Sequence, residues 1–415
     1  MESSMKFGRP ERIKALTFTS LGHFTNDFNI LLFSVLITYY HRYFGISLAL
    51  LGAIAIIYNI ISGFLSTPIG RYADKTRAYR GLMMLGIFIL GVSLFLFGFS
   101  FLSASFVIWI MLIAVIFLGI GQAFYHPLGG SILNVTYGER AASALGINGA
   151  FGSIGRSALP VILVPLILLV GKAYALFVAG TYMFVAGVVI YAGLSFLKKR
   201  EIPNRSREAS SAANKETYLR YRGVLAIIVA MIFIRAMFLT GTTTYISQFV
   251  LDRVKSEILM SYILTISFLT AVIGQPVFGR LTEKYGGKWS ISITTILSTL
   301  FFIFFMLSGD NAVLDTVTYA AFVFMAFTGF PVLMGYVNQI VPNNISTTAN
   351  GLVWGLGNTV GGGIGIAVMS IFLNLHFTLT SVMWIMIIFG VISAFFIPLI
   401  PGVKRSAELK SGSPL

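Results

Sequence analysis

The feature that most constrains this chain is a series of long apolar segments. A bilayer span needs about 20 mainly apolar residues, and the 415-residue sequence contains twelve segments of about that length, from Leu16–Tyr40 to Ser381–Ile400. Only 10% of the residues are charged, against roughly 25% in soluble domains. The strands of a membrane barrel would instead be short and alternate in polarity. The sequence therefore predicts an all-α integral membrane protein with twelve transmembrane helices.

Lys and Arg are distributed unevenly over the loops that join these segments. The loops on the side of both termini hold 23 of the 29 basic residues, and the opposite loops hold 4. Because basic loops stay in the cytoplasm, we expect both termini to be cytoplasmic and the protein to lie in the plasma membrane. The net charge of +15 forms no single patch, which argues against a nucleic-acid partner. The basic and then apolar N-terminus is too long in its apolar part for a signal peptide, so we expect a retained first helix.

The two halves of the chain resemble each other. The loop after the second segment, GRYADKTRAYRG (70–81), matches the loop after the eighth, GRLTEKYGGK (279–288), at an offset of 209 residues. A second match, between ALGINGAFGSIG (144–155) and ANGLVWGLGNTV (349–360), has an offset of 205. Such internal repeats are typical of secondary transporters. We predict two pseudo-symmetric six-helix bundles, 1–197 and 223–403, with a cytoplasmic linker at 198–222 and a cytoplasmic tail at 404–415.

Few ionisable residues lie inside the apolar segments. Asp27 is the only acidic residue deep within one, Arg156 and Arg235 are the only basic ones, and His126 is similarly deep. At 1.5 Å per residue, all four lie within one or two helical turns of a common level near the middle of the bilayer. Charges at this depth are costly and mark functional pathways. The sequence therefore predicts a functional site near the membrane midplane.

Polar residues also form two stripes at helical spacing. His23, Asn26 and Asp27 in the stretch GHFTNDFNI (22–30) are spaced i, i+3, i+4, so they share one helix face. Gln122 and His126 are spaced i, i+4 on the fourth segment. We expect these stripes to supply the polar side chains of the site.

Two interpretations of Asp27 remain open. In the first, it pairs permanently with Arg156 or Arg235, and this static network only fixes the packing of the helices. In the second, it exchanges a proton, with His126 as relay or substrate donor. A change of partner would then change its affinity for the proton. The repeat aligns Asp27 with Arg235. His126 directly precedes Pro127, and a histidine there can instead serve to hydrogen-bond the backbone of a helix interrupted by proline.

These features together resemble the major facilitator superfamily. The resemblance rests on twelve segments in two halves and on a G-x-x-x-D/E-K loop after segments two and eight. The stretches GHFTNDFNILLFSVL, GQAFYHPLGG and GAFGSIGRSALP, with Arg235 in the seventh segment, are similar to the fosmidomycin-resistance branch. One difference is the pair Leu159-Pro160, where that branch usually has Gly-Pro.

The resemblance implies roles for particular residues. Segments one, four, seven and ten would line a central cavity. Independently of the resemblance, the intramembrane charge of Asp27 leads us to expect Asp27 and His126 to couple protons. The expected substrate cavity comprises His23, Asn26, Gln122, Arg156, Arg235, Tyr245 and Asn338, and the expected cytoplasmic gate comprises Gly70, Asp74, Lys75, Arg77, Glu283 and Lys284. The glycines of the fifth and eleventh segments read as seams that let helices pack closely.

The expected function is proton-coupled export of small organic, drug-like or anionic molecules. Proton-coupled uptake of an organic acid or sugar is an alternative, and a non-transporting sensor or scaffold is a remote one. No phosphate-binding loop, metal-ligand spacing or catalytic set occurs in the sequence, so we expect no enzyme activity, no metal and no cofactor other than the coupling ion, H⁺. There is no cysteine, and hence no disulfide. The expected partners are a small-molecule substrate and the lipid bilayer, with the protein as a monomer.

Overall fold

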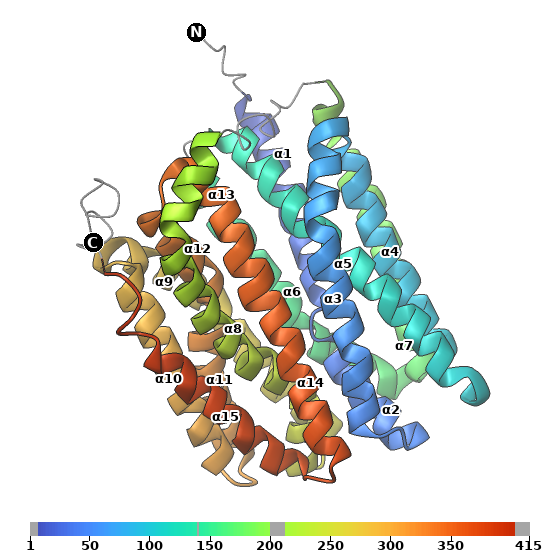
Figure 1. Ribbon diagram of the computed structural model, residues 1–415. Coiled ribbons are helices and arrows are strands. Elements are labelled where there is room, and N and C mark those ends of the chain that lie inside the picture. Colours follow the sequence, from blue (N-terminus) through green and yellow to red (C-terminus); the bar gives the residue numbers. More distant parts are fainter. Residues whose placement is uncertain (1–6, 139–140, 200–211, 403–415) are drawn as a thin grey trace. The chain divides into compact units, whose positions relative to one another are not determined.

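The computed structural model describes residues 7–138, 141–199 and 212–402, and within these ranges it contains helices and no strand (Figure 1). This confirms the predicted all-α class. Within the same ranges, nine helices are long and apolar enough to cross a membrane, and two shorter ones, Ala312–Ala326 and Leu379–Phe395, are also apolar. The predicted tail at 404–415 and residues 200–211 of the predicted linker lie outside the described residues.

The helices divide into two compact units. The first unit comprises residues 1–31 and 61–206, and the second comprises residues 32–60 and 207–415, so the chain passes between the units within the first and second apolar segments. The first unit contains α1 (Arg9–Phe28), the later part of α3 (Leu48–Thr76), α4 (Tyr79–Ser100), α5 (Val107–Tyr137), α6 (Ala141–Val170) and α7 (Lys172–Gly193). The second contains α2 (Leu32–Phe44), the start of α3, α8 (Ala212–Val254), α9 (Glu257–Tyr285), α10 (Gly287–Leu307), α11 (Ala312–Ala326), α12 (Gly329–Ile340), α13 (Asn343–Leu352), α14 (Gly361–Asn374) and α15 (Leu379–Phe395). The predicted bundle boundaries stay a prediction.

The first apolar segment is broken after Phe28, one residue beyond Asp27. A continuous helix is the simplest expectation for Leu16–Tyr40, but α1 ends at Phe28 and α2 begins at Leu32. The side chain of Asn29 explains the break, because its Nδ2 donates to the backbone oxygen of Thr25 at 2.9 Å. The backbone N–H of Asn29 bonds instead to the oxygen of Asn26 at 3.1 Å. A side-chain amide thus takes the acceptor that the next helical turn needs.

Two later segments also depart from a regular α-helix. The tenth is split between α11 and α12 at Phe327 and Thr328, and the eleventh contains a π-helical stretch, Val353–Val360, between α13 and α14. Helix α8 begins earlier than its apolar segment, at Ala212 inside the predicted linker. Its first residues, AANKETYLRYR, are mostly strong helix formers, which accounts for the early start.

The predicted glycine seams are confirmed as close helix contacts. In the first unit, a Cβ atom added at Gly155 of α6 would collide with the backbone oxygen of Phe24 in α1. In the second unit, Gly365 of α14 stands in the same relation to the backbone oxygen of Met237 in α8. Glycine at these positions lets two helix backbones touch. The seam holds α6 against the helix that carries Asp27.

We therefore expect Gly155→Ala to destabilise the protein by about 1–3 kcal/mol, because the added methyl group must displace the backbone of α1. Gly146→Ala is the matched control, since beyond the helix's own adjacent turns no described atom lies within 4 Å of a Cβ at Gly146 in the same helix. Unfolding of the purified variants in detergent measures both effects. Equal stability of the two variants would show that the seam tolerates a side chain.

Candidate functional site

The site is centred on Asp27, the last acidic residue of α1. Its side chain is 2% exposed, and Arg156 Nη2 from α6 donates to its Oδ2 at 2.8 Å. Asn26 Nδ2 donates to its Oδ1 at 3.0 Å. The sequence left two partners open, Arg156 and Arg235, and the structure pairs Asp27 with Arg156. Each oxygen of the buried carboxylate thus accepts one charge-assisted or amide hydrogen bond and keeps further acceptor capacity.

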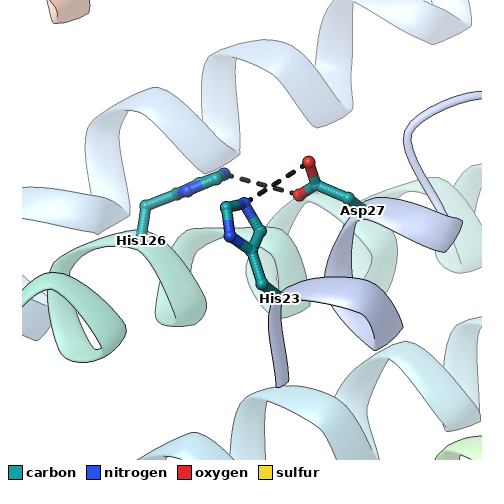
Figure 2. Close-up of side chains that lie close together, drawn as sticks. All are labelled: His23, Asp27 and His126. Carbon is teal, nitrogen blue, oxygen red and sulfur yellow. Dashed lines mark ion pairs between the residues drawn. The ribbon is translucent and has the colours of Figure 1, made fainter. Parts of the chain in front are cut away.

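Two histidines approach the same carboxylate from α1 and α5 (Figure 2). His23 Nε2 lies 3.5 Å from Asp27 Oδ2, and His126 Nε2 lies 3.9 Å from Oδ1. The exposed fraction of the side chain falls from 47% at His126 to 14% at His23 and 2% at Asp27. Both distances exceed a direct hydrogen bond, so a proton would pass by a small side-chain rotation or a bridging water. The set connects an accessible titratable group to a buried one.

Asn148 of α6 orients His23. Its Nδ2 lies 3.3 Å from the hydroxyl of Thr19, whose own proton goes to the backbone oxygen of Ala15. The amide nitrogen must therefore face Thr19, and the amide oxygen faces His23 Nδ1 at 2.8 Å. An oxygen acceptor at this position requires a proton on Nδ1, which leaves His23 Nε2 as the nitrogen that faces Asp27. The contact between Nε2 and the carboxylate is attractive when a proton lies on one of them, so the pair is suited to share one.

The sequence pattern missed Asn148 and Tyr125. The ring of Tyr125 stacks on His23 with a centroid distance of 4.6 Å, and its hydroxyl donates to the backbone oxygen of Thr19 at 2.9 Å. A signal for Asn148 was present, because Asn148, Gly152 and Arg156 are spaced i, i+4, i+8 on one face of α6. A Cβ at Gly152 would collide with the ring of His23. Residues of this stripe on α6 contact the polar stripe on α1, since Asn148 bonds to His23 and Arg156 to Asp27.

His23, Asp27 and His126 are also close enough to share a metal ion, since one ligand atom from each lies within 4.8 Å of the others. Sequence spacing did not indicate this set because its members come from two helices. Two imidazoles and a carboxylate are ligands that several divalent metals accept. However, Arg156 places a positive charge 2.8 Å from the shared carboxylate, which disfavours a second cation. The arrangement is better suited to a proton.

Other predicted residues of the first unit lie near this set or at the end of α3. Gln122 Nε2 donates to the backbone oxygen of Asn29, at the break after α1, at 3.4 Å. At the end of α3, Asp74 accepts a hydrogen bond from Tyr79 of α4, and Lys75 and Arg77 are exposed. A Cβ at Gly70 of α3 would lie 3.3 Å from the Pro127 side chain of α5. The structure thus links the predicted gate to α4 and α5.

Predicted residues of the second unit lie in four separate places. Arg235 is buried in α8 beside the α11–α12 break, where its Nη2 donates to the backbone oxygen of Ala326 at 3.4 Å. Tyr245 is fully buried, and its hydroxyl lies 3.0 Å from Ser370 Oγ and 3.3 Å from the backbone oxygen of Leu48.

The remaining two places are more accessible. Asn338 is exposed, and its Oδ1 accepts hydrogen bonds from Ser346 and Asn350. Glu283 and Lys284 are exposed at the end of α9. The proposed roles of these residues as a cavity and a gate stay predictions.

Comparison with known proteins gives matches over most of the chain. The model of the Major Facilitator Superfamily matches residues 19–257 and 254–414. An uncharacterised MFS-type transporter, YfnC of Bacillus subtilis (strain 168), is 23% identical over 82% of this chain and 83% of its own. The fosmidomycin resistance protein of Escherichia coli (strain K12) is 21% identical over 85% of this chain and 84% of its own.

Solved structures give the same fold. A variant of the nucleoside transporter NupG has a TM-score of 0.75 at 16% identity and covers 94% of this chain and 99% of its own. A bacterial homologue of the human lysosomal transporter Spinster also has a TM-score of 0.75, at 15% identity, over 99% of this chain and 100% of its own. At this identity the similarity concerns the fold alone. It confirms the predicted fold class.

Proposed function

We propose a function from one premise: the chain belongs to the Major Facilitator Superfamily. It is accordingly a multi-pass membrane transporter, as its relatives and structural neighbours are transporters. We infer that it is a secondary transporter of the plasma membrane with cytoplasmic termini, which works by alternating access and couples export of small organic molecules to protons.

One observation supports proton coupling above the others. Asp27 is almost completely buried, yet it lies within 4 Å of an arginine and two histidines. Burying a charged group is costly unless it is paired, so a protein that needed only tight packing would gain little from this cluster. The graded exposure from His126 to Asp27 suits a path for protons, because the outer member is accessible in the protein and the inner member is not.

The proposed cycle is an exchange of partners at Asp27. While Arg156 donates to Asp27 Oδ2, the carboxylate is stabilised in its charged form. A movement of α6 relative to α1 that lengthens this contact would leave a buried carboxylate, which binds a proton rather than remain unpaired. His23 and His126 would deliver or remove that proton. The energy of the proton gradient then biases the conformational change.

Export of drug-like molecules is the part of the proposal that concerns substrate and direction. It is supported by the fosmidomycin resistance protein among the relatives, at 21% identity over most of both chains. Uptake of an organic acid or sugar uses the same proton chemistry in the opposite direction. The two are distinguished by the side of the membrane on which substrate accumulates.

A transport assay tests the proposal. Purified protein in proteoliposomes, loaded with a panel of compounds that includes fosmidomycin, is given an imposed pH gradient. We expect at least one compound to accumulate against its gradient and a protonophore to abolish this accumulation. Movement of a compound that responds to its own gradient but not to the pH gradient would contradict proton coupling.

A further inference from the structure

Arg235 is an unusual residue in the second unit. It is the one charged residue inside the predicted segments seven to twelve, and it is only 7% exposed. None of the carboxylates in the described ranges forms an ion pair with it. Its Nε is buried and has no hydrogen-bond partner among the described residues. A guanidinium in this environment carries a charge that the rest of the described structure does not balance.

The guanidinium lies at the break between α11 and α12. Its described hydrogen bond goes from Nη2 to the backbone oxygen of Ala326, the last residue of α11, at a long 3.4 Å. A Cβ atom at Gly329, the first residue of α12, would lie 3.1 Å from Nη1. Arg235 therefore contacts the end of one helix and the beginning of the next. The partial negative charge of the α11 C-terminus offsets only about half of a unit charge.

The beginning of α12 is itself a favourable place for an anion. The first backbone N–H groups of a helix have no acceptor within the helix and carry a partial positive charge. In α12 the first two residues, Gly329 and Phe330, supply such groups, whereas Pro331 has no N–H. Thr328, the residue before α12, makes no side-chain hydrogen bond to these groups. Its hydroxyl donates to the backbone oxygen of Met325 instead, at 3.0 Å. Two sources of positive potential thus meet at the break, and among the described residues neither has an acidic side chain or a side-chain cap to satisfy it.

We propose that Arg235 and the N-terminus of α12 form a binding site for an oxyanion, the carboxylate or phosphoryl-type group of a small molecule. The fork of the guanidinium donates two parallel hydrogen bonds to such a group, and the helix N-terminus adds backbone donors. As a statement about the transported molecule, this inference rests on the proposed function. As a statement about binding, it is independent of any proton gradient. The competing explanation is that Arg235 only caps α11.

The experiment measures anion-dependent thermal stability of the purified full-length protein in detergent. Sodium acetate, inorganic phosphate and methylphosphonate are titrated against sodium chloride at constant pH and ionic strength. We expect at least one oxyanion to raise the melting temperature of the wild type in a saturable way. In Arg235→Gln, the apparent dissociation constant is expected to rise about 10- to 100-fold, because a charge-assisted pair is lost. Arg235→Lys keeps the charge but not the fork of the guanidinium, so its apparent dissociation constant is expected to lie between those of the wild type and Arg235→Gln.

Arg280→Gln is the matched control, because Arg280 is an exposed arginine of α9 in the same unit. It is expected to keep the full shift in melting temperature. The proposal is overturned if no oxyanion stabilises the wild type beyond chloride, or if Arg235→Gln keeps the shift. In the second case, the anions act on the whole surface, and Arg235 serves only as a helix cap. Neither result bears on proton coupling. Conversely, if the transport assay fails, a saturable shift in melting temperature that depends on Arg235 still supports the oxyanion site.

Discussion

Proteoliposomes that contain Asp27→Asn protein are expected to lose gradient-driven accumulation completely while still exchanging substrate across the membrane. Asparagine has nearly the shape of aspartate, and it can still accept a hydrogen bond from Arg156. It cannot bind or release a proton, so the pH gradient has no buried group on which to act. The measurement compares accumulation under an imposed pH gradient with exchange at equal pH on both sides, for a compound that the wild type transports.

Asp252→Asn is the matched control for this prediction. Asp252 lies exposed near the end of α8 and accepts a hydrogen bond from Gln248 at 2.8 Å, away from the Asp27 cluster in the sequence and in its contacts. We expect proteoliposomes with Asp252→Asn protein to accumulate the compound as well as those with the wild type. If Asp27→Asn protein still concentrates the compound against its gradient, Asp27 does not couple transport to protons, and the static interpretation of the cluster is correct.

The part of the site that helical spacing defines could be predicted from the sequence. A charge in a long apolar segment is conspicuous, so Asp27 stood out, and the positions of His23 and Asn26 on its face follow from 3.6 residues per turn. The choice of Arg156 over Arg235 did not follow, because both lie at similar depth in their segments. Distances between helices depend on side-chain packing. The glycines of the fifth segment predicted a close seam, but they did not say which helix α6 packs against.

The breaks in the helices could not be predicted by hydropathy, because a broken span is as apolar as a continuous one. The first break depends on a single amide, Asn29 Nδ2, which occupies the oxygen of Thr25. The break beside Arg235 contains Phe327 and Thr328, which give no strong turn signal. Asn148 was missed for a related reason. One asparagine in an apolar segment is ambiguous until the hydrogen bond to His23 is seen.

A double-mutant cycle on Asp27 and Arg156 tests whether the two residues interact as the structure shows. Arg156→Gln leaves a carboxylate with 2% exposure and no guanidinium, which is expected to cost about 3–5 kcal/mol of the free energy of unfolding. Asp27→Asn leaves an arginine that is 13% exposed, and the cost is expected to be smaller because that charge is better solvated. The double variant Asp27→Asn/Arg156→Gln holds no buried charge at this point. It is expected to be more stable than Arg156→Gln alone.

The measurement is reversible unfolding of the four proteins in mixed micelles. Strict additivity of the two single effects would show that the residues do not interact. The pH dependence of Arg156→Gln adds a second test, because Asp27 can relieve its lost pairing by binding a proton. A static ion pair predicts a large interaction energy between the two residues. Transport activity would then fall only in proportion to the loss of folded protein. A pair that opens during the cycle predicts that Arg156→Gln folds with Asp27 protonated and exchanges substrate, but no longer responds to the pH gradient.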